Sequence, residues 1–444
     1  MSEILTSTTA TTANTATTTS RPCPHCAAPI ACDPRFTDWC PACEWNLAPA
    51  PDPARRRGAR SRARVERLYD AMAARPAEAG QHRSGAWLAA MVLATAVNLV
   101  TLAVLAGSVW LLLAGWLGLK AVGVAGLGLA WVLRPRLGRW RATEPGELTP
   151  DRAPVLHAVA ARVAAAVGTA APDRIVMDHQ YNASYARVGL RSRVRLTLGL
   201  PLWTALTGDE RLALLGHELG HGGNGDQRRG FWLRTAQGAL TEWLRLLLPY
   251  RGDRFRLRTA RQSALDHLAT LLLQVLAQPV LLLWTVLNRL TERSSQQAEY
   301  LADERAAAVA SSAAAERMLA KLMLDRSVQV RLSQQRTAAQ LRGRSGTVRG
   351  GQVEQTEQVE QFWTGLRGYL DSVPATERER RARLSALEMS AVDTTHPPTH
   401  LRVRMRAVRP ARTAAVTVTA AEWAAVEAEL APARRRIGQR LLGW

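Results

Sequence analysis

A long apolar stretch is the feature that most restricts the fold of this 444-residue chain. Between Ala86 and Leu133, Lys120 carries the only formal charge. A helix needs about 20 apolar residues to span a bilayer, so the stretch is long enough for two helices, with a turn among the glycines of 106–118. We therefore predict a transmembrane helical hairpin at residues 84–134. A buried hydrophobic hairpin in a soluble protein is the alternative.

Positive charge is concentrated at both ends of this hairpin. The net charge of +21 comes mainly from arginine, because Lys120 and Lys321 are the only lysines. Arginines are dense at 55–67 and 134–141, and the positive-inside rule then makes both outer ends cytoplasmic. Arginine beside a span favours anionic lipid headgroups, although the run at 55–67 could instead bind nucleic acid. The segment 49–83 is predicted as a basic linker and juxtamembrane helix.

Two Cys-x-x-Cys pairs near the N-terminus predict a zinc ribbon at residues 21–48. Thirteen residues separate the pairs, a spacing at which four thiolates can hold one structural zinc. So short a module buries little apolar surface, and the metal would supply its folding energy. Cys32 or His25 could substitute for a ligand. The four predicted ligands are Cys23, Cys26, Cys40 and Cys43.

Cysteine usage and the first residues indicate the compartment. All five cysteines precede residue 44, so the rest of the chain has no internal disulfide, as in a reducing environment. Residues 1–20 are a Thr/Ala/Ser run without an apolar core, which predicts a disordered tail rather than a signal peptide. With the arginine distribution, this favours a multi-pass inner-membrane protein with a cytoplasmic ribbon.

The sequence His-Glu-Leu-Gly-His at residues 217–221 predicts a metal site on a helix. Residues four apart project from one helix face, so His217 and His221 can bind the same zinc. Glu218 lies between them and is free to carry a proton. Thr207 followed by Glu210 is a capping-box pattern that begins this helix. The alternative is a surface helix with two unrelated histidines.

A catalytic zinc needs a third protein ligand, with the fourth position left for water. Glu299 is the best candidate, because Asp303 lies one helical turn further on and could orient a ligand histidine through its second ring nitrogen. Glu304 is a rival ligand, and a solvated acidic helix face is the alternative. The residues alone do not decide between them.

The surrounding segments predict an α+β domain that is mostly helical. Ala153–Val167 has helical apolar spacing, while Arg174–Met177 and Arg193–Leu198 have the pattern of short strands. We expect a peptidase-like domain at residues 140–410, with a loop at 336–361 near its cleft. A final helix is predicted within 411–444.

Several motifs resemble the HtpX-like and CAAX prenyl-endopeptidase family of integral-membrane zinc metallopeptidases. The resemblance covers about residues 150–408, in the family's order, and the preceding membrane hairpin is also expected. The chain departs from the pattern in its added ribbon and in Ser184, where an aromatic residue is usual. The matching segments are Asn182–Ala186, Leu196–Leu202, Glu210–His221, Asn224–Asp226, Glu299–Asp303 and Thr395–Pro398 with Arg402.

The resemblance implies a zincin-type fold and a role for each matching residue. It makes Glu299 the third zinc ligand. It assigns Asn182 to binding substrate backbone beside the strand at 193–198, and His396 to stabilising the oxyanion. Arg402 is carried over as a substrate-binding residue. A turn asparagine and a His-Pro helix stop are the alternatives for Asn182 and His396.

A second membrane crossing is a separate question. Leu268–Leu287 is uncharged and long enough to span. His221 and Glu299 must lie on one side of the bilayer, so crossings between them must be even in number. The only companion segment, Phe231–Leu248, contains charges that are costly in a membrane. We therefore expect two amphipathic helices at the inner leaflet, although one branch of the family has a second pair of spans here.

Two functions are consistent with these features. The first is a membrane-anchored zinc endopeptidase with one catalytic and one structural zinc, acting on membrane or membrane-proximal proteins in quality control. The second is a non-enzymatic regulator tethered to the membrane, whose ribbon binds nucleic acid or protein. In both, membrane lipid and a partner of the ribbon are expected, and the peptidase domain is cytoplasmic.

Overall fold

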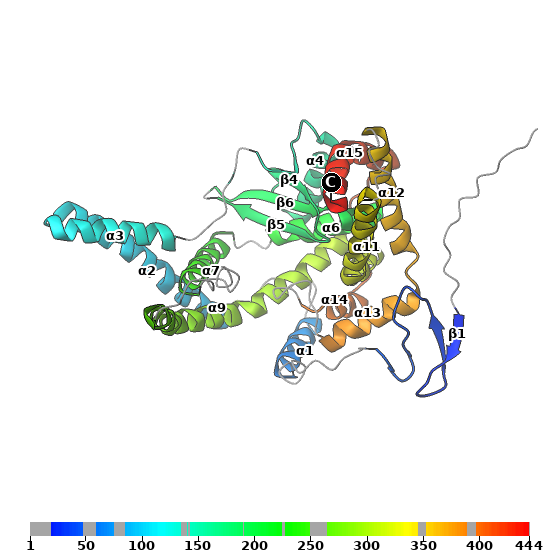
Figure 1. Ribbon diagram of the computed structural model, residues 1–444, viewed down its shortest axis with the longest axis horizontal. Coiled ribbons are helices and arrows are strands. Elements are labelled where there is room, and N and C mark those ends of the chain that lie inside the picture. Colours follow the sequence, from blue (N-terminus) through cyan, green and yellow to red (C-terminus); the bar gives the residue numbers. More distant parts are fainter. Residues whose placement is uncertain are drawn as a thin grey trace, which may run out of the picture.

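The computed structural model describes residues 19–47, 59–74, 85–134, 140, 143–189, 191–223, 227–248, 264–344, 352–388 and 397–443. These parts are mostly helical with two small sheets, so the predicted fold class is confirmed. In Figure 1, helices α2 and α3 extend from one side of the molecule, and the N-terminal ribbon lies on the opposite side.

The ribbon begins with a short antiparallel hairpin. Strands β1 (Thr19–Pro22) and β2 (Pro29–Cys32) pair with Thr19 opposite Cys32. The hairpin therefore starts inside the segment expected to be a disordered tail. Residues 1–18 of that tail lie outside the described residues.

Three helices precede the central domain: α1 (Ala59–Ala73), α2 (Gly85–Ala114) and α3 (Leu117–Leu133). The chain turns between α2 and α3 at Gly115 and Trp116, within the stretch expected to hold the turn. Helix α2 has the length and apolar composition to cross a membrane, and so does Leu268–Ala310. Large apolar side chains of α2 are exposed, among them Leu88, Val92, Leu99, Trp110 and Leu113.

A four-stranded sheet forms one wall of the central domain, in the order β3 (Glu147–Leu148), β4 (Arg174–Asp178), β6 (Arg193–Gly199) and β5 (Ala183–Val188). Strands β4 and β6 are parallel, and β5 is antiparallel to β6. The two predicted strands are present, whereas β5 was not predicted. Helix α4 (Pro154–Val167) matches the predicted helix and packs its apolar face into the core.

The core of the domain lies between this sheet and a group of helices. Helix α5 (Leu200–Ala205) leads into α6 (Gly208–Gly220), which continues as a 3-10 turn, η2 (His221–Gly223). Helix α6 packs along α9 (Ala264–Ala310) and α10 (Ser312–Leu322). Figure 1 shows α9 running from the α2–α3 side into this core.

The segment expected to form two amphipathic helices forms one separate helix and the first part of α9. Helix α7 (Gln227–Leu247) packs Ala236, Ala239 and Leu240 into a cluster with α2 and with Leu287 of α9. Helix α9 is one continuous helix of 47 residues that contains both the apolar segment and Glu299. Exposed apolar side chains lie along its first half, including Leu271, Leu272, Leu273, Val275 and Leu276.

The C-terminal part adds five helices: α11 (Asp325–Arg344), α12 (Gln352–Asp371), α13 (Ala375–Glu388), α14 (Thr399–Val408) and α15 (Ala420–Leu442). Residues 336–344 and 352–361 of the predicted loop are helical, so this expectation was wrong for them, and the residues between lie outside the described part of the chain. Val359 and Trp363 of α12 are buried in the core against α15, and that burial stabilises a helix whose first part is polar.

Candidate metal centre

Helix α6 begins at a well-fixed N-terminus. The backbone N–H of Thr207 donates to Glu210 Oε2 at 2.9 Å, as expected for the predicted capping box. Glu210 is buried and also accepts a hydrogen bond from Lys321 Nζ of α10 at 2.7 Å. These contacts fix the start of the helix whose far end carries the two histidines.

Glycines allow α6 and α9 to pack closely. A Cβ atom on Gly216 would lie 3.1 Å from the Cα of Ala306, and one on Gly220 would lie 3.3 Å from the Cα of Ala302. Larger side chains at these positions would push the helices apart. Arg305 of α9 also donates to the carbonyl oxygens of residues 220 and 223. This close approach brings the Glu299 carboxylate of α9 to the two histidines at the C-terminal end of α6.

The structure brings His217, His221 and Glu299 together. The Nε2 atoms of His217 and His221 lie 3.5 Å from Glu299 Oε2 and Oε1, respectively. One donor atom from each residue lies within 4.8 Å of the other two. Donors about 2.0–2.2 Å from a tetrahedral zinc lie about 3.4 Å apart. Two imidazoles and a carboxylate at these separations therefore fit zinc.

A buried ion pair lies behind this group. His217 Nδ1 donates to Asp303 Oδ1 at 3.0 Å. Arg402 of α14 donates to both oxygens of Asp303, at 2.6 and 2.8 Å, and is 1% exposed. Asp303 therefore fixes the His217 ring through Nδ1, which leaves Nε2 directed towards Glu299.

Electrostatics in this pocket favour a proton on His217 when no metal is bound. Burial and the positive charge of Arg402 lower the pKa of His217. Hydrogen bonds to Asp303 and Glu299 outweigh both effects and raise the pKa to about 9. Zinc binding would therefore displace a proton from this ring.

Comparison with known proteins agrees with this geometry. The family model of peptidase family M48 matches residues 150–409, more than half of the chain. The chain belongs to peptidase family M48. No curated protein and no solved structure matches it. The resemblance found in the sequence is confirmed, and the members of this family are zinc-dependent metallopeptidases.

Other residues expected to act in this M48 peptidase lie at different distances from the centre. Glu218, 6% exposed, lies on α6 between the histidines. Asn182 directly precedes β5, and its carbonyl oxygen accepts the Gly199 N–H at 2.8 Å. His396 lies outside the described residues. Arg402 is buried behind His217, where its guanidinium donates to Asp303 and lies 3.3 Å from His217 Nδ1.

The strand expected to face a substrate is not available for pairing. Strand β6 at residues 193–199 is bonded to β4 on one side and to β5 on the other. The edge on this side of the sheet is therefore β5. It lies close to the metal residues, because a Cβ atom on Gly222, next to His221, would lie 2.7 Å from the Tyr185 hydroxyl. The sequence did not reveal this because β5 has no clean alternation of apolar residues.

The ribbon of this M48 peptidase gathers the four predicted thiols. Cys23 Sγ lies 3.7 Å from Cys43 Sγ, and Cys26 Sγ lies 3.6 Å from Cys40 Sγ. Zinc–sulfur bonds of about 2.3 Å in a tetrahedron place the sulfurs about 3.8 Å apart, so the group fits zinc. Cys32 is buried outside the cluster, with its thiol near the Ile30 carbonyl.

The ribbon is packed against the rest of the protein. Trp39 is 3% exposed and packs with Leu384 of α13, and its indole N–H donates to the Thr376 carbonyl at 3.2 Å. Arg383 donates to the Pro41 carbonyl at 2.8 Å. The ribbon is thus bound to the surface formed by α12 and α13, although the family does not require it.

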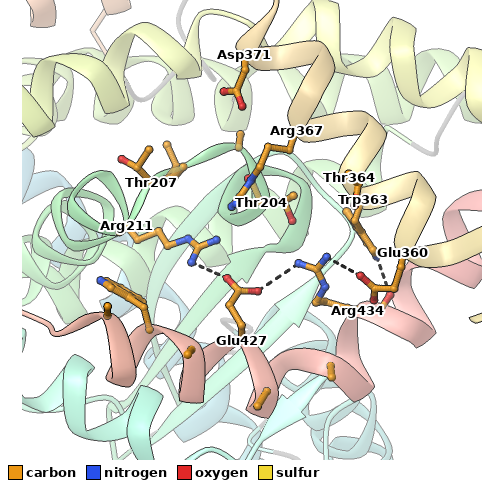
Figure 2. Close-up of a pocket in the computed structure, with 18 of the residues that line it drawn as sticks. Thr204, Thr207, Arg211, Glu360, Trp363, Thr364, Arg367, Asp371, Glu427 and Arg434 are labelled. Atoms are coloured by element: carbon orange, nitrogen blue, oxygen red, sulfur yellow. Dashed lines mark hydrogen bonds and ion pairs between the residues drawn. The ribbon is translucent and has the colours of Figure 1, made fainter. Parts of the chain in front are cut away.

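A cavity of about 1010 Å³ lies at the N-terminal end of α6, away from the metal residues. Figure 2 shows a chain of ion pairs along it: Arg211 to Glu427 at 2.6 Å, Glu427 to Arg434 at 3.3 Å, and Arg434 to Glu360 at 3.2 Å. These pairs join α6, α12 and α15. Because the charges largely neutralise one another, this cavity has a structural explanation and is not assigned to the reaction.

Proposed function

We propose that this M48 peptidase is a membrane-anchored, zinc-dependent endopeptidase. The observation that carries the proposal is the convergence of His217, His221 and Glu299, with one donor atom from each within 4.8 Å of the others. His217 lies on α6 and His221 on the 3-10 turn that continues it, whereas Glu299 lies on α9, 78 residues beyond His221. An unrelated acidic helix face would not place its carboxylate between two imidazoles. The buried pair behind His217 supports the same reading.

His217, His221 and Glu299 would hold the catalytic zinc. When bound, zinc polarises the scissile carbonyl and lowers the pKa of water towards neutrality. Glu218 then accepts a proton from water and returns it to the leaving amine, as a general base and acid. Its position next to His217 on the same helix favours this role. Asp303 keeps the His217 ring in one orientation and tautomer.

A peptide substrate would bind as an extended strand along β5. The free edge of a sheet can pair with an added strand through backbone hydrogen bonds, and β5 lies next to the turn that carries His221. Asn182, which precedes β5, would bind substrate backbone near this edge. His396 would stabilise the oxyanion, and donors of this kind contribute about 2.7–4 kcal/mol.

The membrane anchor would consist of α2, α3 and the apolar half of α9. Apolar side chains are exposed along all three helices, and a membrane would remove that surface from water. Helix α7, packed beside α2 and α9, is the companion that an even number of crossings requires. The arginine-rich ends of the hairpin place the peptidase domain and the ribbon on the cytoplasmic side. Substrates would then be membrane proteins or segments near the bilayer.

A second, structural zinc would bind the four ribbon cysteines. The ribbon would recruit a protein or nucleic-acid partner beside the peptidase domain, because it is fixed to α13. A purely regulatory protein, without peptidase activity, would show one tight zinc and a salt-sensitive affinity for nucleic acid. The endopeptidase proposal requires two zincs per chain, of which a chelator removes one with loss of activity.

The decisive variant is Glu218→Gln. It should keep both zincs, because it changes no metal ligand, and it should lose hydrolysis of a casein-like substrate. Glu357→Gln is a matched control, since Glu357 is exposed on α12. Undiminished cleavage by Glu218→Gln would refute the assigned base. Wild-type protein with two zincs and no cleavage of any unfolded protein would refute the peptidase proposal.

A further inference from the structure

A positively charged pocket of about 400 Å³ lies where α1, α2 and α9 meet. Arg67 of α1 and Arg289 and Arg293 of α9 line it, together with one carboxylate, Glu292. Among the residues that the structure describes, none of the three arginines has an ion-pair partner. Pockets for small ligands measure roughly 300–1,000 Å³, so this one can hold a compact anionic group.

Two further features of the pocket favour an anion. Ala86, in the first turn of α2, lines it, and that turn carries no acidic side chain. The backbone N–H groups at a helix N-terminus attract negative charge. Gln296 of α9 also lines the pocket, is 7% exposed, and has no hydrogen-bond partner for its side chain within the described part of the chain. Its side-chain amide is therefore available to a ligand in the pocket.

The position of the pocket indicates where the anion comes from. The apolar half of α9 ends at Leu287, two residues before Arg289, and the apolar stretch of α2 begins at Ala86. The pocket therefore lies where the apolar stretch of α9 ends and that of α2 begins. The exposed side chains of Leu281 and Leu282 continue from this end along α9. A lipid phosphate in the pocket would have its acyl chains beside apolar helix surface.

We propose that this pocket binds the phosphate of an anionic phospholipid, and that the bound lipid raises peptidase activity. The second part rests on the proposed function. The lipid phosphate joins α1, through Arg67, to α9, through Arg289 and Arg293. It thereby holds the juxtamembrane helix against the helix that carries the third metal ligand.

The link from this pocket to the metal centre is short. Leu68 lines the pocket and belongs to a buried cluster with Tyr300 and Leu401. Tyr69 packs edge-on against Tyr300, with ring centroids 6.5 Å apart. Tyr300 directly follows Glu299, and Leu401 directly precedes Arg402. A lipid that fixes α1 therefore tightens the packing around both residues.

Lipid binding is tested without reference to activity. The full chain carrying Glu218→Gln is purified from vesicles of phosphatidylcholine and phosphatidylglycerol, and retained lipid is counted by native mass spectrometry. Replacing both Arg289 and Arg293 by glutamine should weaken phosphatidylglycerol retention by about 25-fold, on the order of fivefold per arginine. Changing Arg435 and Arg436 to glutamine, both exposed on α15, removes the same charge elsewhere and should leave retention unchanged.

Ala86→Phe provides a second test, because it fills the pocket without a change of charge and should also abolish retention. An equal loss of phosphatidylglycerol retention in the α15 control would overturn the proposed site. Unaltered retention in both pocket variants would do the same. Regulation is tested by casein hydrolysis in phosphatidylcholine vesicles with and without phosphatidylglycerol. The wild type should hydrolyse casein faster with phosphatidylglycerol. In the pocket variants the rates with and without phosphatidylglycerol should be nearly equal.

The outcomes separate the two proposals. Lipid retention without any cleavage contradicts the proposed function but leaves the site standing. Cleavage that is independent of phosphatidylglycerol, despite retention, overturns regulation by lipid. Soluble glycerol 3-phosphate added to phosphatidylcholine vesicles gives the remaining comparison. If it reproduces the full stimulation, the ligand is a soluble phosphate and the lipid proposal is wrong.

Discussion

Asp303→Asn tests how the metal centre is held. Asp303 is 2% exposed, accepts a hydrogen bond from His217 Nδ1 at 3.0 Å, and pairs with Arg402 at 2.6 and 2.8 Å. In the variant, the side-chain amide oxygen can still accept a hydrogen bond from His217. Its NH₂ group faces Arg402 and cannot accept a hydrogen bond from the guanidinium. The guanidinium of Arg402 then lies buried without its counter-ion. Both zinc affinity and folding stability should fall, by different amounts.

The magnitudes separate these two effects. Loss of a group that orients a ligand histidine weakens metal binding about 10–100-fold, which corresponds to about 1.4–2.8 kcal/mol. Removing one partner of a buried ion pair costs about 3–5 kcal/mol of stability. Adding Arg402→Met removes the uncompensated charge. The double variant should regain most of its stability and still bind zinc 10–100-fold more weakly.

The assays are a chelator-buffered zinc titration, with the ribbon site already filled, and thermal unfolding of the metal-free protein. Asp151→Asn is the matched control, because Asp151 is exposed and remote from the metal residues. Wild-type zinc affinity in the double variant would show that Asp303 does not orient His217. Wild-type stability of Asp303→Asn would contradict the buried ion pair.

Three further predictions follow from other contacts. The pKa of His217 is about 9 in the metal-free protein, so a proton competes with zinc for this ring. Zinc affinity should therefore rise about tenfold per pH unit between pH 6.5 and 8. A zinc affinity that does not change with pH would contradict this. Trp39→Ala should release the ribbon from α13, because truncating a buried Trp costs about 3–5 kcal/mol of stability. Amide hydrogen exchange should then accelerate in residues 23–47 and stay unchanged in α6. Glu427→Gln removes the counter-ion of buried Arg211 and should lower the free energy of unfolding by about 1–3 kcal/mol. The exposed control Glu357→Gln should leave the free energy of unfolding unchanged, and an equal loss in this control would refute the explanation.

The elements that the sequence predicted are those with strong local signals. The capping box at Thr207, the helix spacing of His217 and His221, and the alternation in Arg193–Leu198 each depend on residues close together in the chain. The paired cysteines are similar, because their spacing matches one metal geometry. In each case the local pattern corresponds directly to the structure that forms.

The elements that were missed depend on distant contacts. Strand β5 became a strand because β6 lies beside it, not because its own residues alternate. The polar sequence of α12 became helical because Val359 and Trp363 bury against α15. The continuity of α9 was missed because a charged, glutamine-rich segment follows its apolar half and resembles a boundary. In a helix that leaves a membrane, such a change in composition marks the interface rather than an end.

In the proposed topology, that continuity would connect the membrane to the metal centre. Leu287, Arg293, Glu299 and Asp303 lie on one helix, so their relative positions along its axis are fixed by backbone hydrogen bonds. Glu299 follows Leu287, the last residue of the uncharged apolar segment, by 12 positions, or about 18 Å at about 1.5 Å per residue. An extended substrate covers that distance with about six residues. If α9 anchors the protein as proposed, a peptidase with Glu299 on this helix would reach segments that emerge from the bilayer, and the anchor would determine which bonds lie within reach.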